Sequence, residues 1–183
     1  MNRGAPSVLV LSHLYPSTRQ PHLGLFVARQ VQALEGTYEI RVVAPTRWVP
    51  PLTRSWRKER RLPRAEKVTG TTVLRPRVPQ LPRGGLTAES LVLPTALRGL
   101  ARGLHRQRTI ELVHAHFGLP DGWGAAKLAA ELHAPFVLSL WGSDVLVFPE
   151  KTAPRRLLMN VLRSADAVIA PSHEIADRAR ELG

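Results

Sequence analysis

The sequence predicts an α/β fold with a doubly wound, mostly parallel sheet. Short apolar runs of strand length alternate with longer segments in which apolar residues recur at helical spacing. Six such strand candidates occur in the 183 residues, and most are separated by stretches long enough for a crossover helix. A chain that alternates strands and helices in this way builds a parallel sheet with helices on both faces, a Rossmann-like arrangement.

The first half of the chain contains three of these strands and two predicted helices. The strands are expected at residues 7–12, 39–45 and 70–76. A mostly one-sided apolar stripe predicts a helix that begins at Gly24 and ends before Gly36, since glycine commonly ends helices. Thr87 is expected to cap a second helix that runs to about His105 and is interrupted or kinked near Pro94.

The second half contains a strand–turn–helix–strand unit, around which the rest of the chain is organised. The unit consists of a strand at residues 112–116, a helix at 121–133 and a strand at 135–140. Thr152 is predicted to cap the next helix, which ends at Ser164, and a short final strand is expected at residues 165–170. Ser172 then caps a last helix at residues 174–182.

Polar residues cluster at the ends of both strands of that unit. His114 and His116 lie at the end of the first strand, and Ser143 and Asp144 follow the second. In open α/β sheets, ligands bind at the carboxyl ends of the strands. This edge of the sheet is therefore the predicted active-site edge.

Composition limits the kind of protein this chain can be. It has no cysteine, which excludes disulfides, thiolate metal sites and a cysteine nucleophile. No apolar run approaches the roughly 20 residues of a membrane span, and the N-terminus lacks a signal-peptide layout. The chain is therefore expected to be cytoplasmic. Its formal charge of +12 favours an anionic partner, unless it only reflects a preference for arginine on solvated faces.

The basic residues are dense in a proline-rich stretch at residues 47–67. The residues of this stretch expected to meet an anionic surface are Trp48, Trp56, Arg57, Lys58, Arg60 and Arg61. Basic side chains and interfacial tryptophans together are typical of a segment that docks on an anionic membrane, and a basic helix near residues 98–108 would add to it. Nucleic acid is the alternative anion, but no nucleic-acid-binding motif is present, so no specific nucleic acid is expected.

The sequence signatures of the common nucleotide-binding loops are missing. No G-x-G-x-x-G follows the first strand, and there is no P-loop. Instead, the first strand leads into a long loop that ends in a single glycine, Gly24, at a helix N-terminus. Backbone N–H groups at such a position can hold a diphosphate. The alternative is that Gly24 only permits a tight turn.

Several side chains near the predicted edge are candidates for chemistry. His114 and His116 are two residues apart on a strand and therefore point to one face. His116, at the end of the strand, can reach a cleft and hydrogen-bond a hydroxyl group or a developing charge, whereas His114 is expected to pack within the sheet. Asp121 and Asp144 either cap local turns or contact a ligand. No cluster has metal-ligand spacing, and the motifs of serine hydrolases are absent.

Four segments together resemble the family 4 glycosyltransferases of the GT-B fold. They are Tyr15-Pro-Ser with Gly24-Leu-Phe-Val, Val113-His-Ala-His-Phe-Gly-Leu-Pro-Asp-Gly122, Leu140-Trp-Gly-Ser-Asp144, and Ser164-Ala-Asp-Ala-Val-Ile-Ala-Pro-Ser172. They occur in the family's order across nearly the whole chain, which makes the combination specific. The members that this chain resembles most are bacterial enzymes that build cell-envelope or exported polysaccharide.

The resemblance implies two Rossmann-like domains, of which the N-terminal one binds the acceptor and the C-terminal one binds a nucleotide-sugar donor. It implies retaining sugar transfer without a required metal or other cofactor. His116 would contact the transferred sugar at the reaction centre, and Gly24 would lie against the donor diphosphate. The residues expected to bind the acceptor are His13, Tyr15, Asp121, Trp141, Ser143 and Asp144.

Two features depart from the family pattern. Trp141 stands where many relatives carry histidine, and the sequence stops at Gly183, near the point where the family's linker to the donor domain begins. We therefore expect residues 1–183 to be an acceptor-binding half without its donor-binding domain, inactive alone. The expected partners are a nucleotide-sugar and a glycan or lipid-linked acceptor, at the cytoplasmic face of the plasma membrane. The alternative function is a basic nucleic-acid- or carbohydrate-binding module without catalysis.

Overall fold

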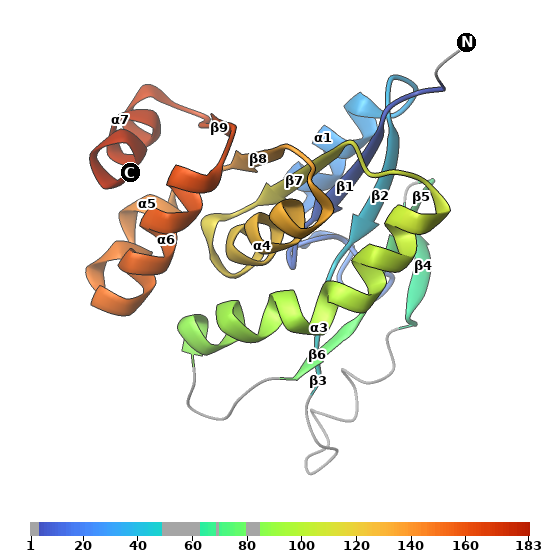
Figure 1. The fold of residues 1–183 in the computed structure, drawn as a ribbon, viewed down its shortest axis with the longest axis horizontal. Helices are drawn as coiled ribbons and strands as arrows, with labels where there is room; N and C mark the ends of the chain where they lie inside the picture. The colour runs from blue at the N-terminus through green and yellow to red at the C-terminus, as the bar shows by residue number, and fades with distance from the viewer. Residues whose placement is uncertain (1–3, 49–62, 69, 80–84) are drawn as a thin grey trace.

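The structure confirms an α/β fold with a mostly parallel sheet flanked by helices (Figure 1). It is a computed structural model that describes residues 4–48, 63–68, 70–79 and 85–183. The strands of the main sheet are β1 (Ser7–Leu11), β2 (Glu39–Val43), β4 (Ala65–Val68), β5 (Thr71–Leu74), β7 (Leu112–His116), β8 (Phe136–Ser139) and β9 (Ala167–Ile169). The six predicted strands are all present.

The order of the strands is that of a doubly wound sheet. The seven strands lie in the order β4-β5-β2-β1-β7-β8-β9, and all neighbours are parallel except β4 and β5. The six parallel strands, numbered along the chain, therefore lie in the order 3-2-1-4-5-6. The direction of winding reverses between β1 and β7, which is where such sheets open a crevice at their carboxyl edge.

Three short strands were not predicted. β4 pairs antiparallel with β5 at the edge of the main sheet, and β3 (Thr46–Trp48) pairs with β6 (Arg77–Pro79) in a separate two-stranded sheet. β3 and β4 overlap the proline-rich basic stretch at residues 47–67, and β6 lies in a segment that contains Pro76 and Pro79. Long-range pairing, rather than local sequence pattern, makes them strands.

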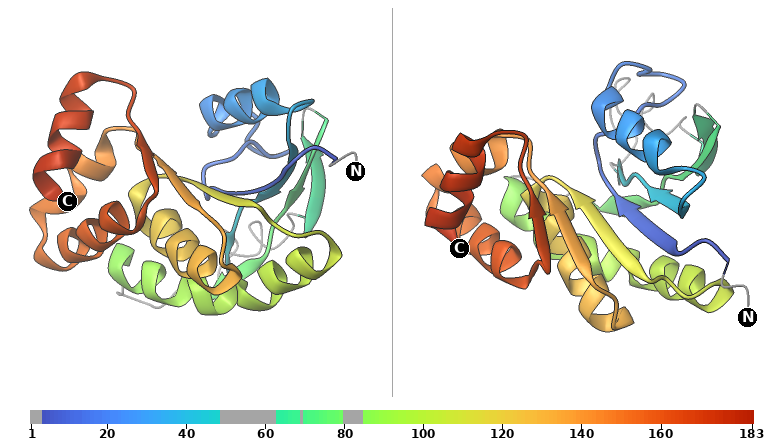
Figure 2. Two further views of the ribbon diagram at one scale, coloured as in Figure 1. Left: turned by 45° about the horizontal axis from the view of Figure 1, so that its top comes forward. Right: turned by 90° about the horizontal axis from the view of Figure 1, so that it is seen from above.

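Helices cover both faces of the sheet (Figure 2). Helix α1 (Leu25–Leu34) lies on one face, and α3 (Gly85–Gln107), α4 (Trp123–Leu132) and α6 (Thr152–Ser164) lie on the other. The remaining helical segments are η1 (Gly118–Gly122), α5 (Ser143–Leu146), η2 (Phe148–Glu150) and α7 (His173–Leu182). No helix in the described ranges is long and apolar enough to cross a membrane.

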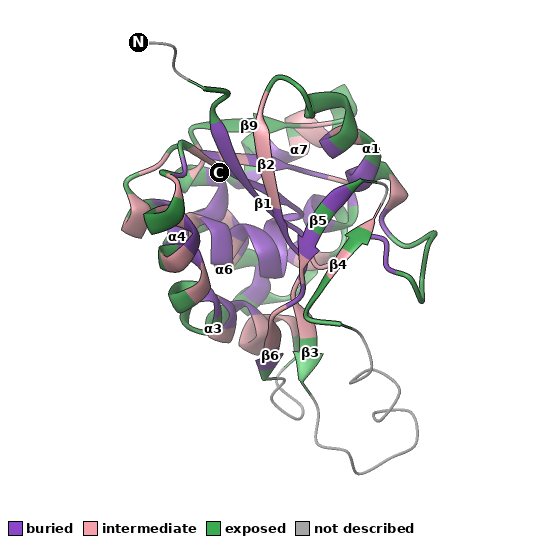
Figure 3. Cartoon of the chain, turned by 90° about the vertical axis from the view of Figure 1, so that its right-hand side faces the viewer, coloured by how far each residue is buried: buried purple, intermediate pink, exposed green. Residues whose placement is uncertain are grey.

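The apolar run at the start of the chain becomes β1, a strand buried on both faces (Figure 3). In β1, Leu9 and Leu11 join the core beneath α3, α4 and α6, whereas Val8 and Val10 join the core beneath α1. All four are at most 4% exposed. This double burial explains why the strand reads as a continuous apolar run rather than an alternating one.

Two helix starts differ from the sequence-based expectation, and one agrees. Helix α3 begins at Gly85, so Thr87 lies inside it, and it continues without interruption through Pro94. A stripe of five buried residues holds α3 against the core and outweighs the missing N–H of the proline: Ser90, Leu93, Leu97, Ala101 and Leu104. Thr152 is the first residue of α6 rather than its cap, whereas Ser172 caps α7 by accepting a hydrogen bond from the Ile175 N–H, as predicted.

A buried ion pair fixes the loop that follows β1. Arg75 and Glu66 are in contact, and their side chains are only 4% and 5% exposed. Arg75 also donates to the Pro16 carbonyl, and the Thr18 N–H donates to Glu66 at 3.1 Å. Burial alone would raise the pKa of Glu66, but the Thr18 N–H and Arg75 together lower it. The edge hairpin β4–β5 therefore positions the β1–α1 loop through charge-assisted hydrogen bonds.

We expect Arg75→Met to destabilise the chain by about 3–5 kcal/mol, because it leaves the Glu66 carboxylate buried without its cation. Urea unfolding measures the effect. Arg180→Met is the matched control, since Arg180 and Asp177 form an exposed ion pair on α7 whose loss should change stability very little. Equal losses in the two variants would contradict a special role for the buried pair.

Candidate functional site

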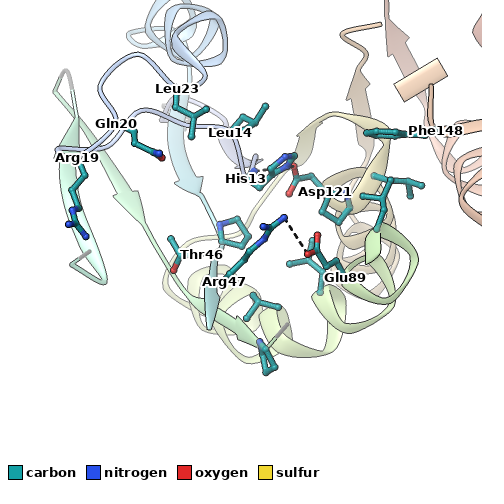
Figure 4. Close-up of a pocket in the computed structure, with 17 residues that line it drawn as sticks. His13, Leu14, Arg19, Gln20, Leu23, Thr46, Arg47, Glu89, Asp121 and Phe148 are labelled. Atoms are coloured by element: carbon teal, nitrogen blue, oxygen red, sulfur yellow. Dashed lines mark hydrogen bonds and ion pairs between the residues drawn. The ribbon is translucent and has the colours of Figure 1, made fainter. Parts of the chain in front are cut away.

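A cavity of about 720 Å³ opens at the carboxyl edge of the sheet, beside the reversal point between β1 and β7 (Figure 4). Its walls come from the β1–α1 loop, the end of β2, β3, β6, α3, η1 and η2, so segments far apart in sequence converge on it. The residues that argue for ligand binding are His13, Arg19, Gln20, Arg47, Glu89, Asp121 and Phe148.

The most distinctive feature of the cavity is a histidine–carboxylate pair. Nδ1 of His13 contacts Oδ2 of Asp121, and the same oxygen accepts the backbone N–H of His13 at 3.0 Å. Asp121 is fully buried, whereas the His13 side chain is 37% exposed. The carboxylate therefore fixes the imidazole ring and leaves its other edge open.

The charges around His13 favour its protonated form. Burial alone would lower the pKa of His13, but the charge and hydrogen bond of Asp121, with a smaller contribution from Glu89, raise it above its ordinary value of 6.5. Arg47 opposes this rise. The imidazole of His13 is therefore more basic than that of an unperturbed histidine.

A second ion pair lies in the same cavity. Arg47, at the centre of β3, and Glu89, in the first turns of α3, are 3.4 Å apart (Figure 4). Glu89 is 21% exposed and Arg47 is 63% exposed. The cavity thus offers a cation, a carboxylate and an imidazole together, beside the apolar ring of Phe148. Such a mixture of donors, acceptors and apolar surface suits a polyhydroxylated ligand.

Sequence reasoning did not single out Arg47, Glu89 or Phe148 as ligand contacts. In the sequence, Arg47 belongs to the basic stretch at residues 47–67, and Glu89 lies within the helix predicted to begin near Thr87. They come together through β3 and α3, and β3 itself was not predicted. No local signal could have found this pairing.

His114 and His116 lie on the face of the sheet that α1 covers. His114 hydrogen-bonds Ser139 at 2.8 Å, whereas neither ring nitrogen of His116 has a partner among the described residues. Burial lowers the pKa of His114 to about 4 and that of His116 to about 3. Both rings are therefore neutral at physiological pH.

An aromatic cluster covers His116, whose side chain is fully buried. The ring of Trp141 stacks 6.0 Å from that of His116, and Phe26 lies 4.3 Å from Trp141. Phe117 completes the cluster at 6.3 Å from Trp141. A ligand can reach the imidazole of His116 only if part of this cover moves.

Asp144 and Tyr15 have evident structural roles. Asp144 is fully buried and accepts the N–H groups of Gly118 at 3.1 Å and Trp141 at 3.0 Å, which joins the turns after β7 and β8. Burial raises its pKa, although these amides counteract the effect. Tyr15 is 1% exposed and packs in the core beneath α1.

The structure brings together only part of the predicted acceptor set. His13 and Asp121 line the cavity, whereas four other predicted residues do not: Tyr15, Trp141, Ser143 and Asp144. Ser143 is the exposed first residue of α5.

Of the predicted membrane-facing residues, Trp48 is 42% exposed at the end of β3. The others lie outside the described residues: Trp56, Arg57, Lys58, Arg60 and Arg61.

Gly24 is required by the backbone. It precedes α1 with φ +70°, in the left-handed region, and a Cβ there would lie 2.3 Å from the Leu14 carbonyl oxygen. The close approach accounts for the glycine without any ligand. It also places the N-terminus of α1 directly against the residue that follows His13.

Metal ligands are not grouped anywhere in the described part of the chain. No three histidine, aspartate or glutamate side chains come close enough there to hold an ion. The site consists instead of hydrogen-bonding and ionic groups at the end of a doubly wound sheet.

Residues 23–183 match the family described as "Glycosyl transferase 4-like domain". The chain belongs to this family. The match covers the helix N-terminus at Gly24, both histidines of β7 and the Asp121 loop, so it includes most of the edge described above.

Two relatives agree with this assignment. A protein of Bacillus subtilis, provisionally named teichuronic acid biosynthesis glycosyltransferase TuaC, is 32% identical over 181 residues, which cover 96% of this chain and 46% of that protein. An uncharacterized glycosyltransferase of Methanocaldococcus jannaschii, MJ1178, is 27% identical over 82 residues, which cover 45% of this chain and 23% of that protein. The chain therefore spans less than half the length of each relative.

We expect Gly24→Ala to destabilise the chain by about 2–5 kcal/mol, because it combines left-handed backbone strain with a collision against the Leu14 carbonyl. Gly36→Ala is the control, since Gly36 also has a positive φ but a Cβ added to it would have no neighbour within 4 Å among the described residues. That variant should lose only about 1–2 kcal/mol from backbone strain. Chemical denaturation that shows equal losses would refute the close approach at Gly24.

Proposed function

We propose that the chain is the acceptor-binding half of a retaining glycosyltransferase. The enzyme transfers a sugar from a nucleotide-sugar to a glycan or lipid-linked acceptor, without a cofactor. The observation that carries the proposal is the cavity at the carboxyl edge of a glycosyl transferase 4-like domain, in which His13, Arg47 and Glu89 meet. The donor-binding groups belong to a second domain, so residues 1–183 alone do not transfer sugar.

The chemistry of the cavity supports acceptor binding there. Sugar hydroxyls both donate and accept hydrogen bonds, and the Arg47–Glu89 pair offers one group of each kind 3.4 Å apart. Phe148 and Leu23 supply apolar surface for the ring carbons. The cavity is large enough for more than one sugar unit, which suits an acceptor that is itself a glycan.

The donor is proposed to lie on the α1 side of the same edge. There the N-terminus of α1 at Gly24 presents the positive end of a helix dipole to a diphosphate. His116 lies beneath Trp141, its two nitrogens unpartnered among the described residues, and a donor sugar that displaces the cover would supply their hydrogen-bond partner. Leaving such a buried group unpartnered costs about 1–3 kcal/mol, and a ligand that hydrogen-bonds the imidazole would remove this cost.

The relative from Bacillus subtilis suggests the class of product. Its name refers to teichuronic acid biosynthesis, and it is similar to this chain over 96% of the chain's length. We propose that this protein likewise acts in cell-envelope or exported polysaccharide synthesis at the cytoplasmic face of the plasma membrane.

Membrane attachment is proposed to involve the region of β3. Trp48 is exposed at its end, close in sequence to the basic stretch. The basic helix α3 contributes less than its composition suggests, because Arg98 and Arg102 both pair with Glu131, and Arg108, just after the helix, pairs with Glu39. The docking surface is therefore the β3 region rather than α3.

We expect His116→Ala to lower sugar transfer by about 10²–10³-fold in a protein that joins this chain to its donor-binding domain, because it removes a hydrogen bond at the reaction centre. Radiolabelled UDP-glucose and UDP-N-acetylglucosamine serve as donor probes, with a lipid extract of the expressing cells as acceptor. His173→Ala, on the exposed start of α7, is the control. Unimpaired turnover of His116→Ala would remove this residue from the mechanism.

The chain should co-sediment with liposomes that contain anionic phosphatidylglycerol and not with neutral phosphatidylcholine liposomes. Each basic residue near an anionic surface contributes about 1 kcal/mol, and an interfacial tryptophan adds anchoring. Trp48→Ala should weaken the binding, whereas Trp123→Ala, on α4, should not. Equal binding to both kinds of liposome would defeat the membrane proposal.

A further inference from the structure

We propose that the acceptor carries an anionic group, a carboxylate or a phosphate, and that His13 and Arg47 are the residues of the cavity that select it. The inference rests on the proposed function and narrows the substrate class of the same site. Three features of the described residues support it: the exposure of the charged side chains, the way in which each cation is held, and the effect of one cation on the other.

The positive groups of the cavity are more accessible to a ligand than its negative groups. The titratable side chains among the described residues that line it are His13, Arg19, Arg47, Glu89 and Asp121. The side chains of Arg47 and His13 are 63% and 37% exposed, whereas those of Glu89 and Asp121 are 21% and 0% exposed. A ligand that enters the cavity therefore meets these two cations before it meets either carboxylate.

A carboxylate holds each of the two cations in place. Nδ1 of His13 contacts Oδ2 of Asp121, and among the described residues no group hydrogen-bonds Nε2, so a protonated ring can donate from Nε2 to a ligand. Arg47 approaches Glu89 through Nη2 at 3.4 Å, and the other N–H groups of its guanidinium can donate to a ligand as well. Positioned cations of this kind bind carboxylates and phosphates through charge-assisted hydrogen bonds.

The two cations oppose each other, and an anion between them would remove this conflict. Burial lowers the pKa of His13, Asp121 in η1 and Glu89 in α3 raise it, and Arg47 in β3 lowers it, with a net pKa above 6.5. The charge of Arg47 therefore reaches the imidazole, and the two side chains converge on the same part of the cavity (Figure 4). Because an anion bound to both would stabilise the imidazolium, ligand binding and protonation of His13 should strengthen each other.

A neutral sugar matches this arrangement less well than an acidic one. Its hydroxyls can pair with Arg47 and Glu89, but they bring no charge to the imidazolium of His13. The carboxylate of an acidic sugar unit can accept from both cations while its hydroxyls donate to Glu89. Phosphate oxygens can accept from the same two cations.

The anionic group has two possible sources. One is an acidic sugar unit of a glycan acceptor, and the other is the diphosphate of a lipid carrier. The second source would lie near the proposed membrane-docking region, because Arg47 is followed by the exposed Trp48 at the end of β3. Both sources present the same chemistry to the cavity, and the experiment below distinguishes them.

Binding to the 183-residue chain tests the proposal with two saccharides that differ chiefly in charge. They are α-1,4-linked trigalacturonate and its methyl ester, compared by isothermal titration calorimetry in low salt. Below the pKa of His13, trigalacturonate should bind about 10-fold more tightly than the ester, because its hydrogen bonds to the cations are charge-assisted. Its affinity should fall as the pH rises through that pKa, since only the imidazolium donates from Nε2, whereas the affinity of the ester should not follow it.

Arg47→Gln and His13→Gln test the two residues separately. Each should weaken the binding of trigalacturonate about 10-fold and that of the ester much less. His13→Gln should also abolish the pH dependence, which a merely structural loss would not do. Arg180→Gln is the matched control, because Arg180 is an exposed arginine that pairs with a carboxylate on α7, outside the cavity. Thermal unfolding of each variant confirms that it is folded.

Inorganic pyrophosphate identifies the source of the anionic group. Only pyrophosphate binding that Arg47→Gln weakens is counted, since the helix N-terminus at Gly24 is a separate candidate for phosphate. If pyrophosphate binds more tightly than trigalacturonate, the cavity selects the diphosphate of a lipid carrier. If trigalacturonate binds more tightly, it selects an acidic sugar. Either result supports an anionic acceptor.

The outcomes separate the inference from the proposed function. If trigalacturonate binds no better than its ester, and no binding of pyrophosphate is sensitive to Arg47→Gln, the inference is overturned. Sugar transfer by the protein that carries the donor-binding domain, with the donor probes and lipid extract named above, is measured independently. If sugar is transferred but neither anion is selected, the function stands without the inference. If the anions are selected but no sugar is transferred from either donor, the anion site stands and the proposed function fails.

Discussion

The parallel pairing of β1 with β7 is the constraint on which the site depends. Their register, with Val8 opposite Leu112 and Leu11 opposite Ala115, brings the ends of both strands to the same level of the sheet. Because the winding reverses here, the chain leaves β1 toward one face and β7 toward the other, and the loops diverge. His13 and Asp121, 108 positions apart in sequence, meet across this divergence.

Two buried carboxylates, Asp144 and Asp121, lie at this edge, and they differ in how many of their oxygens accept hydrogen bonds. Asp144 has both oxygens engaged by backbone N–H groups, one from Gly118 and one from Trp141, and so joins two turns. Asp121 has one oxygen engaged by His13 and the other unpartnered within the described ranges. The carboxylate of Asp144 therefore joins the turns after β7 and β8, whereas Asp121 has hydrogen-bonding capacity left on one oxygen beside the imidazole of His13.

The sequence predicted the elements that local pattern determines. The six parallel strands and α1 follow from apolar runs and periodicity, whereas β3, β4 and β6 depend on long-range partners and were missed. The cavity contains residues of both kinds. His13 and Asp121 belong to the acceptor set that the family resemblance implies, whereas Arg47 and Glu89 reach the cavity through β3 and α3 and were not predicted. Tyr15 follows the same strand as His13 yet lies in the core beneath α1, which position in sequence alone does not reveal.

His13 and His116 are linked through the aromatic rings of Phe117 and Trp141, and the environments of the two histidines differ. Phe117 lies 5.5 Å from the ring of His13 and 6.3 Å from that of Trp141, which in turn stacks on His116. Without a charged partner, burial keeps His116 neutral down to a pH of about 3, so this ring contributes no titration near neutrality. His13 has the opposite environment, since Asp121 favours its charged form. Of these two imidazoles, His13 is therefore the more basic, because its side chain is partly exposed and its partner is an anion.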